Sequence, residues 1–181
     1  MKKTFGCRLA LMLALSTATT VGLKLPVAVA APAPNFAPKD SGFSVWLPGK
    51  PQVTPTKLPI KGGKPINVKM YSLSSGPVSY VVLPVDLPAT LNSNGVSKYL
   101  VGAEKGFVRS TGVKITSSKN ITLNGYKGRE ISGELGTNVM TARFFAGKRR
   151  AFQIIAGSPK YKTVAQSAQI AKVLGSFRLA P

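Results

Sequence analysis

The sequence contains no histidine, a single cysteine and only five acidic residues among 181. Without histidine, imidazole acid–base catalysis and histidine-ligated metal sites are excluded. The closest acidic pair, Glu130 and Glu134, would lie about 13 Å apart along a strand. That separation exceeds the roughly 5 to 9.5 Å between the carboxylates of glycosidases, so we expect both acids to form surface ion pairs. The sequence predicts no catalytic residue, no cofactor and no metal site, and therefore no enzyme.

Nucleotide and acyl-transfer motifs are missing as well. Each Gly-Lys pair is followed by Pro or Arg, so no phosphate-binding Gly-x4-Gly-Lys-Ser/Thr loop can be formed. Outside the N-terminal segment there is no Ser-x-x-Lys, the spacing that serine acyl enzymes use. These absences favour a binding role over a catalytic one.

Residues 1–30 have the pattern of a secretory signal peptide. Lys2, Lys3 and Arg8 precede a seven-residue apolar run at 9–15, and Ala28-Val29-Ala30 supplies the small residues of a cleavage site. The alternative is a retained membrane anchor, but the run is far shorter than the roughly 18 residues of a membrane span. We expect an exported protein of the periplasm, the thylakoid lumen or the extracellular space. Its mature chain would lack cysteine, because Cys7 leaves with the leader.

The chain beyond residue 30 is strongly basic. The leader holds four of the 25 basic residues and none of the five acidic ones, so the net charge of the remainder is +16. Such a field favours an anionic membrane surface, an envelope polymer or an acidic membrane protein as partner. Export makes nucleic acid an unlikely partner. The alternative is that the charge serves only solubility in the compartment, and the oligomeric state is left open.

Apolar periodicity predicts a single domain over residues 43–181, preceded by a Pro/Ala-rich tail at 31–42 that should not order itself. Strands are expected at 43–47, 66–73, 78–85, 113–123, 127–135, 139–146, 151–156 and 176–179. One helix is expected over 94–109, and another from Ser158-Pro159 to Leu174. Hairpin-length connections, such as Asn124-Gly125, predict an α+β fold, a mostly antiparallel sheet packed with two helices.

Both helices show an apolar stripe. The stripe of the first is Val96, Leu100, Ala103 and Phe107, with Ser93 or Asn94 as its cap. The stripe of the second is Val164, Ala168, Ala171 and Leu174. We expect each stripe to pack against the sheet.

Several short segments carry a family resemblance. They are Phe43-x-Val45-x-Leu47-Pro48-Gly49-x-Pro51, Gly125-Tyr126-x-Gly128-Arg129-Glu130, Arg143-x-Phe145 leading to Phe152, and Ser176-Phe177-Arg178-Leu179. Together they resemble the PsbP-like and DcrB-like exported proteins, which have an α/β/α sandwich fold. The resemblance implies a non-catalytic role, such as an extrinsic subunit or assembly helper at a membrane complex. The absence of histidine departs from PsbP-type metal ligation, and the absence of a cysteine after the leader departs from a DcrB-type lipoprotein.

Two basic clusters are the candidate binding residues. Lys148, Arg149 and Arg150 fall at a predicted hairpin tip, and Lys98, Lys105 and Arg109 form one helical stripe. Both clusters could dock phosphate, sulfate or carboxylate groups, or could be plain solvated charge. The leading hypothesis is therefore an exported accessory protein that docks its basic surface on an anionic partner.

A second hypothesis is a carrier of a small anionic ligand, or an enzyme-like module, with a pocket between sheet and helix. Tyr126, Arg129 and Arg143 would surround the ligand. The alternative for the two arginines is a structural role, as partners of Glu130 or of backbone carbonyls.

Overall fold

The computed structural model describes residues 32–59 and 64–180, and the predicted signal peptide lies outside these residues. The described residues form one compact unit. In the described part of the chain the elements follow one another as β1 (Phe43–Ser44), β2 (Gln52–Leu58), β3 (Ile66–Ser75), β4 (Val78–Asp86), α1 (Ser93–Thr111), β5 (Lys114–Leu123), β6 (Tyr126–Leu135), β7 (Asn138–Ala146), β8 (Arg150–Pro159), α2 (Val164–Ser176) and β9 (Arg178–Leu179).

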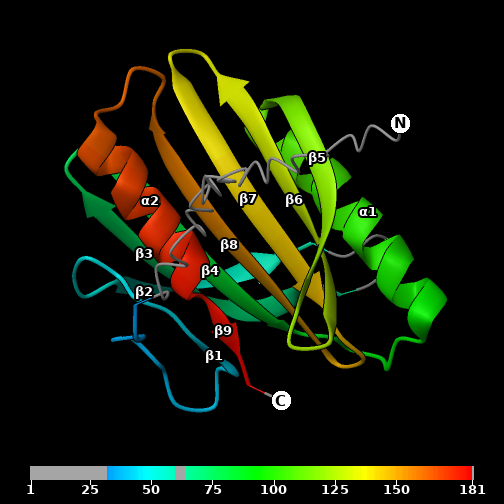
Figure 1. Ribbon diagram of the computed structural model, residues 1–181. Coiled ribbons are helices and arrows are strands. Elements are labelled where there is room, and N and C mark those ends of the chain that lie inside the picture. Colours follow the sequence, from blue (N-terminus) through cyan, green and yellow to red (C-terminus); the bar gives the residue numbers. More distant parts are fainter. Residues whose placement is uncertain (1–31, 60–63, 181) are drawn as a thin grey trace, which may run out of the picture. The chain divides into compact units, whose positions relative to one another are not determined.

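Seven strands form one antiparallel sheet in the order β2-β3-β4-β8-β7-β6-β5, while β1 pairs with β9 apart from it (Figure 1). Hairpin turns join most neighbours, as the Asn-Gly signal predicts. Asn124 and Gly125 have φ angles of +47° and +79°. Two successive residues with positive φ are typical of a type I′ turn, whose twist matches that of the two strands it joins. The predicted α+β class with a largely antiparallel sheet is confirmed.

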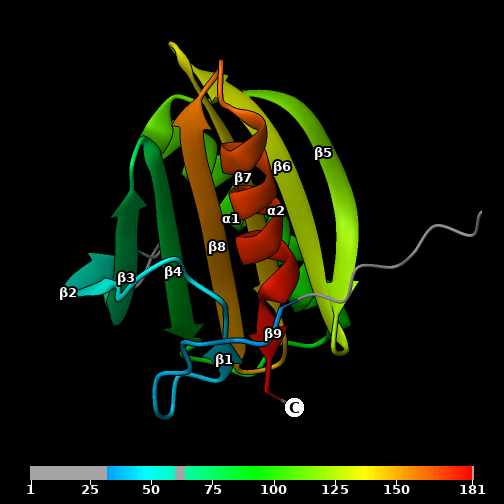
Figure 2. The ribbon, with the colours of Figure 1, turned by 60° about the vertical axis from the view of Figure 1, so that its left-hand side comes forward.

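The helices cover opposite faces of the sheet, so the architecture is an α/β/α sandwich (Figure 2). On one face α1 buries Val96, Leu100 and Phe107, and the ring of Phe107 meets that of Phe144 edge-on at 5.7 Å. On the other face the C-terminal end of α2 delivers Phe177 into a cluster of aromatic rings. Two separate cores therefore hold the sheet between them.

Strand β2 was missed because its sequence, Gln-Val-Thr-Pro-Thr-Lys-Leu, is polar and contains Pro55. A proline cannot donate to a strand ladder, which is why it is tolerated at the edge of a sheet. The edge position of β2 is consistent with that rule.

The expectation that residues 31–42 do not order themselves was wrong from Asn35 onward. Phe36 packs against Phe43 and Tyr71, with ring centroids 6.3 and 5.5 Å apart. The Asn35 side chain both accepts from the backbone N–H of Leu47 and donates to its carbonyl. These side-chain contacts, with two backbone hydrogen bonds between Phe36 and Val45, hold the segment against the domain.

The second helix begins later than predicted. Strand β8 continues to Pro159, which pairs with Asn138, and α2 starts after Thr163. Thr163 and Gln166 form a reciprocal capping box, a stronger start signal than the Ser-Pro pair. The first helix is capped by Asn92 and not by the predicted Ser93 or Asn94; the Asn92 side chain accepts from the N–H of Gly95.

The predicted apolar stripe of α2 was also wrong in three of its four positions. Val164, Ala168 and Ala171 face solvent, while Val173 and Leu174 are buried. Burying larger side chains removes more apolar surface from water than burying alanines, and this decides the rotation of the helix.

Candidate anion-docking site

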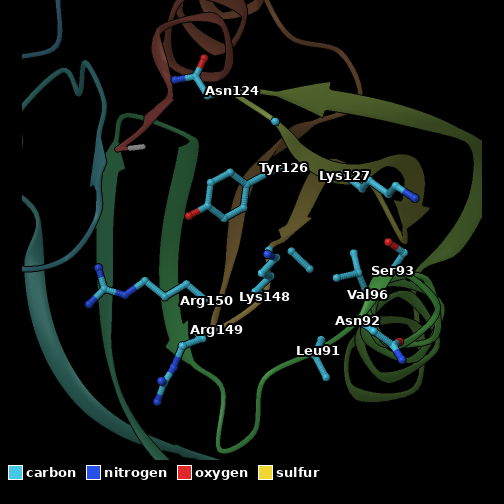
Figure 3. A pocket seen from close by; sticks show the side chains of 13 residues that line it. Leu91, Asn92, Ser93, Val96, Asn124, Tyr126, Lys127, Lys148, Arg149 and Arg150 are labelled. Atoms are coloured by element: carbon cyan, nitrogen blue, oxygen red, sulfur yellow. The ribbon is translucent and has the colours of Figure 1, made fainter.

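A depression of about 710 Å³ opens at one end of the sheet, between the start of α1 and two hairpin turns (Figure 3). The β5–β6 turn contributes Asn124 and Gly125, followed by Tyr126 and Lys127. The β7–β8 turn contributes Gly147, Lys148 and Arg149. These segments meet because Lys127 and Ala146 are register partners in neighbouring antiparallel strands.

The floor of the depression is closely packed. The ring of Tyr126 packs edge-on against Phe152 at 5.7 Å, and Asn124 donates from its side chain to the carbonyl of Leu179 at 2.8 Å. A Cβ atom at Gly147 would lie 2.6 Å from the Tyr126 ring. Only glycine therefore allows the β7–β8 turn to approach that ring.

The β7–β8 turn is also fixed from its outer side. The N–H groups of Leu87 and Leu91 donate to the carbonyls of Arg149 and Lys148 at 2.8 and 2.7 Å. The N–H of Gly147 closes the turn by donating to the carbonyl of Arg150 at 2.8 Å. The backbone of the turn is thus bonded within the protein, while the side chains of Lys148 and Arg149 are exposed to solvent.

The start of α1 adds positive potential to the same depression. Ser93 and Val96 are among its lining residues, and the first turn of the helix has no acidic residue. The positive end of a helix dipole favours anions, and a carboxylate in that first turn would have cancelled the effect.

Carboxylates are absent from the residues that line the depression. Four of the five carboxylates of the chain are held in ion pairs, and only that of Asp86 is paired with a lining residue: Asp86 with Arg150, Glu104 with Arg129, Glu130 with both Arg143 and Lys119, and Glu134 with Lys160. Within the described residues, Lys127, Lys148 and Arg149 make no ion pair. The depression is therefore a concentrated positive surface.

Within the predicted cluster of Lys148, Arg149 and Arg150, the first two are exposed, whereas Arg150 is bonded to other parts of the fold. Arg150 donates to the Asp86 carboxylate at 2.7 Å and to the carbonyl of Asp40 at 2.9 Å. It thus serves the fold, although it borders the depression. Figure 3 shows Arg149 and Arg150 on one side of the depression and Lys127 on the other.

The predicted stripe of Lys98, Lys105 and Arg109 is exposed on α1 and lies outside the lining of the depression. Lys98 and Lys105 are two helical turns apart, and Arg109 follows one turn later. The stripe is thus a second, flat basic surface on the outer side of the helix.

The structure does not bring Tyr126, Arg129 and Arg143 around one cavity. Arg129 projects from the α1 face of the sheet and pairs with Glu104 of that helix. Arg143 projects from the opposite face, where it pairs with Glu130 and donates to the carbonyl of Leu174 at 2.7 Å. Successive side chains of a strand point to opposite faces, and Arg143 is the register partner of Glu130, the residue that follows Arg129, so the two arginines lie on opposite faces.

Lys127 and the start of α1 are functional candidates that the sequence reasoning missed. The signal for Lys127 was its place after an Asn-Gly turn, which pairs it with the end of β7. No feature of the sequence predicts that α1 begins at this end of the sheet, because the position of the helix depends on long-range packing.

The described residues offer neither a membrane-spanning helix nor a metal-binding cluster. Neither α1 nor α2 combines the length and the apolar character that a membrane crossing requires. No group of three or more potential metal-ligating side chains comes together among residues 32–59 and 64–180.

Comparison with solved structures shows the class of fold. The chain resembles the cyanobacterial PsbP protein (CyanoP) from Synechocystis sp. PCC 6803, with a TM-score of 0.56 at 9% identity, covering 80% of this chain and 90% of that one. A protein of unknown function from Pseudomonas aeruginosa, PA94, aligns with a TM-score of 0.39 at 12% identity, over 67% of this chain and 95% of that one. The fold is thus PsbP-like, as the sequence resemblance implied. No protein-family model matches the sequence, and no curated protein does.

Proposed function

We propose that this chain is an exported, non-catalytic accessory protein that docks its basic depression on an anionic envelope or membrane-complex partner. One observation carries the proposal. Lys127, Lys148 and Arg149 line one depression beside the start of α1, and no carboxylate lines it. Asp86 neutralises only Arg150, and within the described residues Lys127, Lys148 and Arg149 have no ion-pair partner.

The architecture fits docking better than capture of one small anion. The cations come from different segments and point to different sides of the depression, so they do not converge on a single phosphate-sized group. A broad acidic face can contact all three cations at once. Complementary charge of this kind raises association rates and selects partners.

The test uses fluorescein-labelled poly-glutamate as a stand-in for an acidic protein face, with binding followed by anisotropy. Affinity of the wild type should fall steeply between about 20 and 200 mM salt, because exposed charges are screened. The triple variant Lys127→Gln, Lys148→Gln, Arg149→Gln should bind at least about tenfold more weakly. A matched control replaces Lys57, Lys64 and Lys114 with Gln, and should lose less than about threefold.

Equal losses in the two triple variants would show that net charge, not the depression, governs binding, and would refute the proposal. The carrier alternative makes a different prediction in a thermal-shift assay. A tightly held small anion, with inorganic phosphate as the first probe, would raise the melting temperature by mass action. Turnover of any substrate would overturn the non-catalytic assignment.

A further inference from the structure

The β8–α2 connection exposes apolar surface at the opposite end of the sheet from the basic depression. Tyr161 is 93% exposed and Val164 is 88% exposed, the two highest values among the large apolar residues of the described chain. Strand β6 runs from the depression at Tyr126 to this end at Leu135, a length of about 30 Å. We call Tyr161 and Val164, with the neighbouring Lys160 and Lys162, the apex.

The apex is held in place. The N–H of Lys160 donates to the carbonyl of Thr137 at 2.8 Å, and its ammonium group pairs with Glu134 at 3.0 Å. On the other side, Thr163 and Gln166 cap the first turn of α2 reciprocally. The segment that carries the apolar side chains is therefore anchored by hydrogen bonds on both sides.

The outer face of α2 continues this apolar surface. Val164, Ala168 and Ala171 succeed one another at helical spacing and are all exposed. The single charged residue of α2, Lys172, places its ammonium group 3.6 Å from the centre of the Trp46 ring. By contrast, the outer face of α1 carries Lys98, Lys105 and Arg109. The two faces of the sandwich thus differ sharply in polarity.

We infer that the apex is a membrane-contacting surface, on which Tyr161 and Val164 enter the headgroup region of an anionic lipid bilayer. This inference concerns a surface separate from the basic depression and does not depend on it. Tyrosine is enriched at membrane–water interfaces because its ring is apolar and its hydroxyl remains wet. Lys162 lies next to it with charge that anionic lipid attracts, at the end of a long apolar stem, while the neighbouring Lys160 is paired with Glu134.

A bilayer suits this surface better than a second protein does. A stable protein interface buries about 800 Å² on each partner, far more than two large side chains and a row of alanines supply. A lipid headgroup layer needs no matching pocket, so a protruding pair of side chains can enter it individually.

Tryptophan fluorescence tests the apex directly. Full-length chain carrying Trp46→Phe and Tyr161→Trp has its single indole at the apex. With vesicles of phosphatidylglycerol and phosphatidylcholine, the emission of this apex indole should shift to the blue and be quenched by lipids brominated near the headgroup. All variants share residues 1–31, so a difference between them reports the substituted side chains.

Partitioning onto the same vesicles supplies the second readout. Tyr161→Ser combined with Val164→Ser should weaken it at least about tenfold, since each buried apolar side chain contributes about that factor. Val53→Ser, at an exposed apolar residue on β2, is the matched control and should leave it unchanged.

Three other results would contradict the inference that the apex contacts a membrane. An unshifted and unquenched emission of the apex indole, or equal partitioning of the double variant and the control, would refute the inference. Self-association without vesicles that Tyr161→Ser abolishes would instead assign the surface to a second copy. The depression substitutions, placed in the same single-tryptophan chain, should leave the blue shift intact, so failure of one proposal is distinguishable from failure of the other.

Discussion

Glu130 allows a sharp comparison, because one carboxylate binds two cations in different surroundings. Its partner Arg143 is 28% exposed at a distance of 2.5 Å, and its partner Lys119 is 68% exposed at 2.8 Å. The Glu130 side chain itself is only 13% exposed. We predict that Arg143→Met destabilises the protein by about 3 kcal/mol, whereas Lys119→Met costs less than about 1 kcal/mol.

The larger value follows from two losses. Removing one partner of a mostly buried pair costs roughly 3–5 kcal/mol, which the remaining Lys119 contact reduces here. The carbonyl of Leu174 also loses a charged donor, typically about 1.5–3 kcal/mol, but water reaches part of that end of α2. For a domain of about 150 residues, a loss of about 3 kcal/mol corresponds to a fall in melting temperature of roughly 6–12 °C.

Urea unfolding followed by circular dichroism measures both variants, and methionine preserves side-chain length in each. Arg143→Lys is the informative third variant, because an ammonium group keeps the charge but cannot span both acceptors. It should fall between wild type and Arg143→Met. Losses for Arg143→Met and Lys119→Met that agree within about 0.5 kcal/mol would refute the argument from burial.

Three further predictions concern acid stability and packing. Burial alone would raise the pKa of Glu130, but hydrogen bonds and charge from its two cations outweigh burial and lower it. Wild-type stability should therefore fall as the pH drops below about 4.5, and more steeply than that of Glu130→Gln, as urea midpoints from about pH 6 to pH 3 would show. Gly147→Ala should cost about 1–3 kcal/mol through its clash with Tyr126, whereas Gly102→Ala, on open helix surface, should be neutral or stabilising in the same thermal melts. Phe177→Ala should cost about 3–5 kcal/mol in urea unfolding, and a loss under about 1 kcal/mol would contradict its central place in the aromatic cluster.

Periodicity was sufficient for most of the fold. Strand runs and the Asn124-Gly125 turn placed the long antiparallel hairpins, and the α1 stripe identified the helix face that packs on the sheet. These features are local, because turn chemistry and side-chain alternation act over a few residues. Strand β2 and the packing of Phe36 were missed because both depend on distant partners.

The rotation of α2 shows where local reasoning ends. Two stripes compete on this helix, one of small residues through Ala168 and Ala171 and one through Ile170 and Val173. The sequence alone shows both, but the choice depends on what the sheet presents, which here is the aromatic cluster around Phe177. Because the stripe through Ala168 and Ala171 was expected to pack on the sheet, the sequence did not predict that this side of α2 is exposed.

The basic clusters required the same long-range information. That Lys148 and Arg149 are exposed follows from a hairpin tip, but the pairing of Arg150 with Asp86 joins residues 64 positions apart. The predicted pocket around Tyr126, Arg129 and Arg143 is not formed, because Arg129 and Arg143 lie on opposite faces of the sheet. Lys127 joined the site only through pairing of β6 with β7.

Arginines and lysines are used differently in this chain, and the difference indicates the kind of partner. Beyond residue 30 there are six arginines, and four of them, Arg129, Arg143, Arg150 and Arg178, donate to carboxylates or carbonyls inside the fold. Planar guanidinium groups, which hold one phosphate or carboxylate in fixed geometry, are thus mostly used for structure. The exposed charge is left mainly to lysines, compact ions on flexible stems that impose little geometry. A surface of that composition discriminates poorly between individual ligands but responds strongly to charge density, which favours an extended anionic partner over a single small anion.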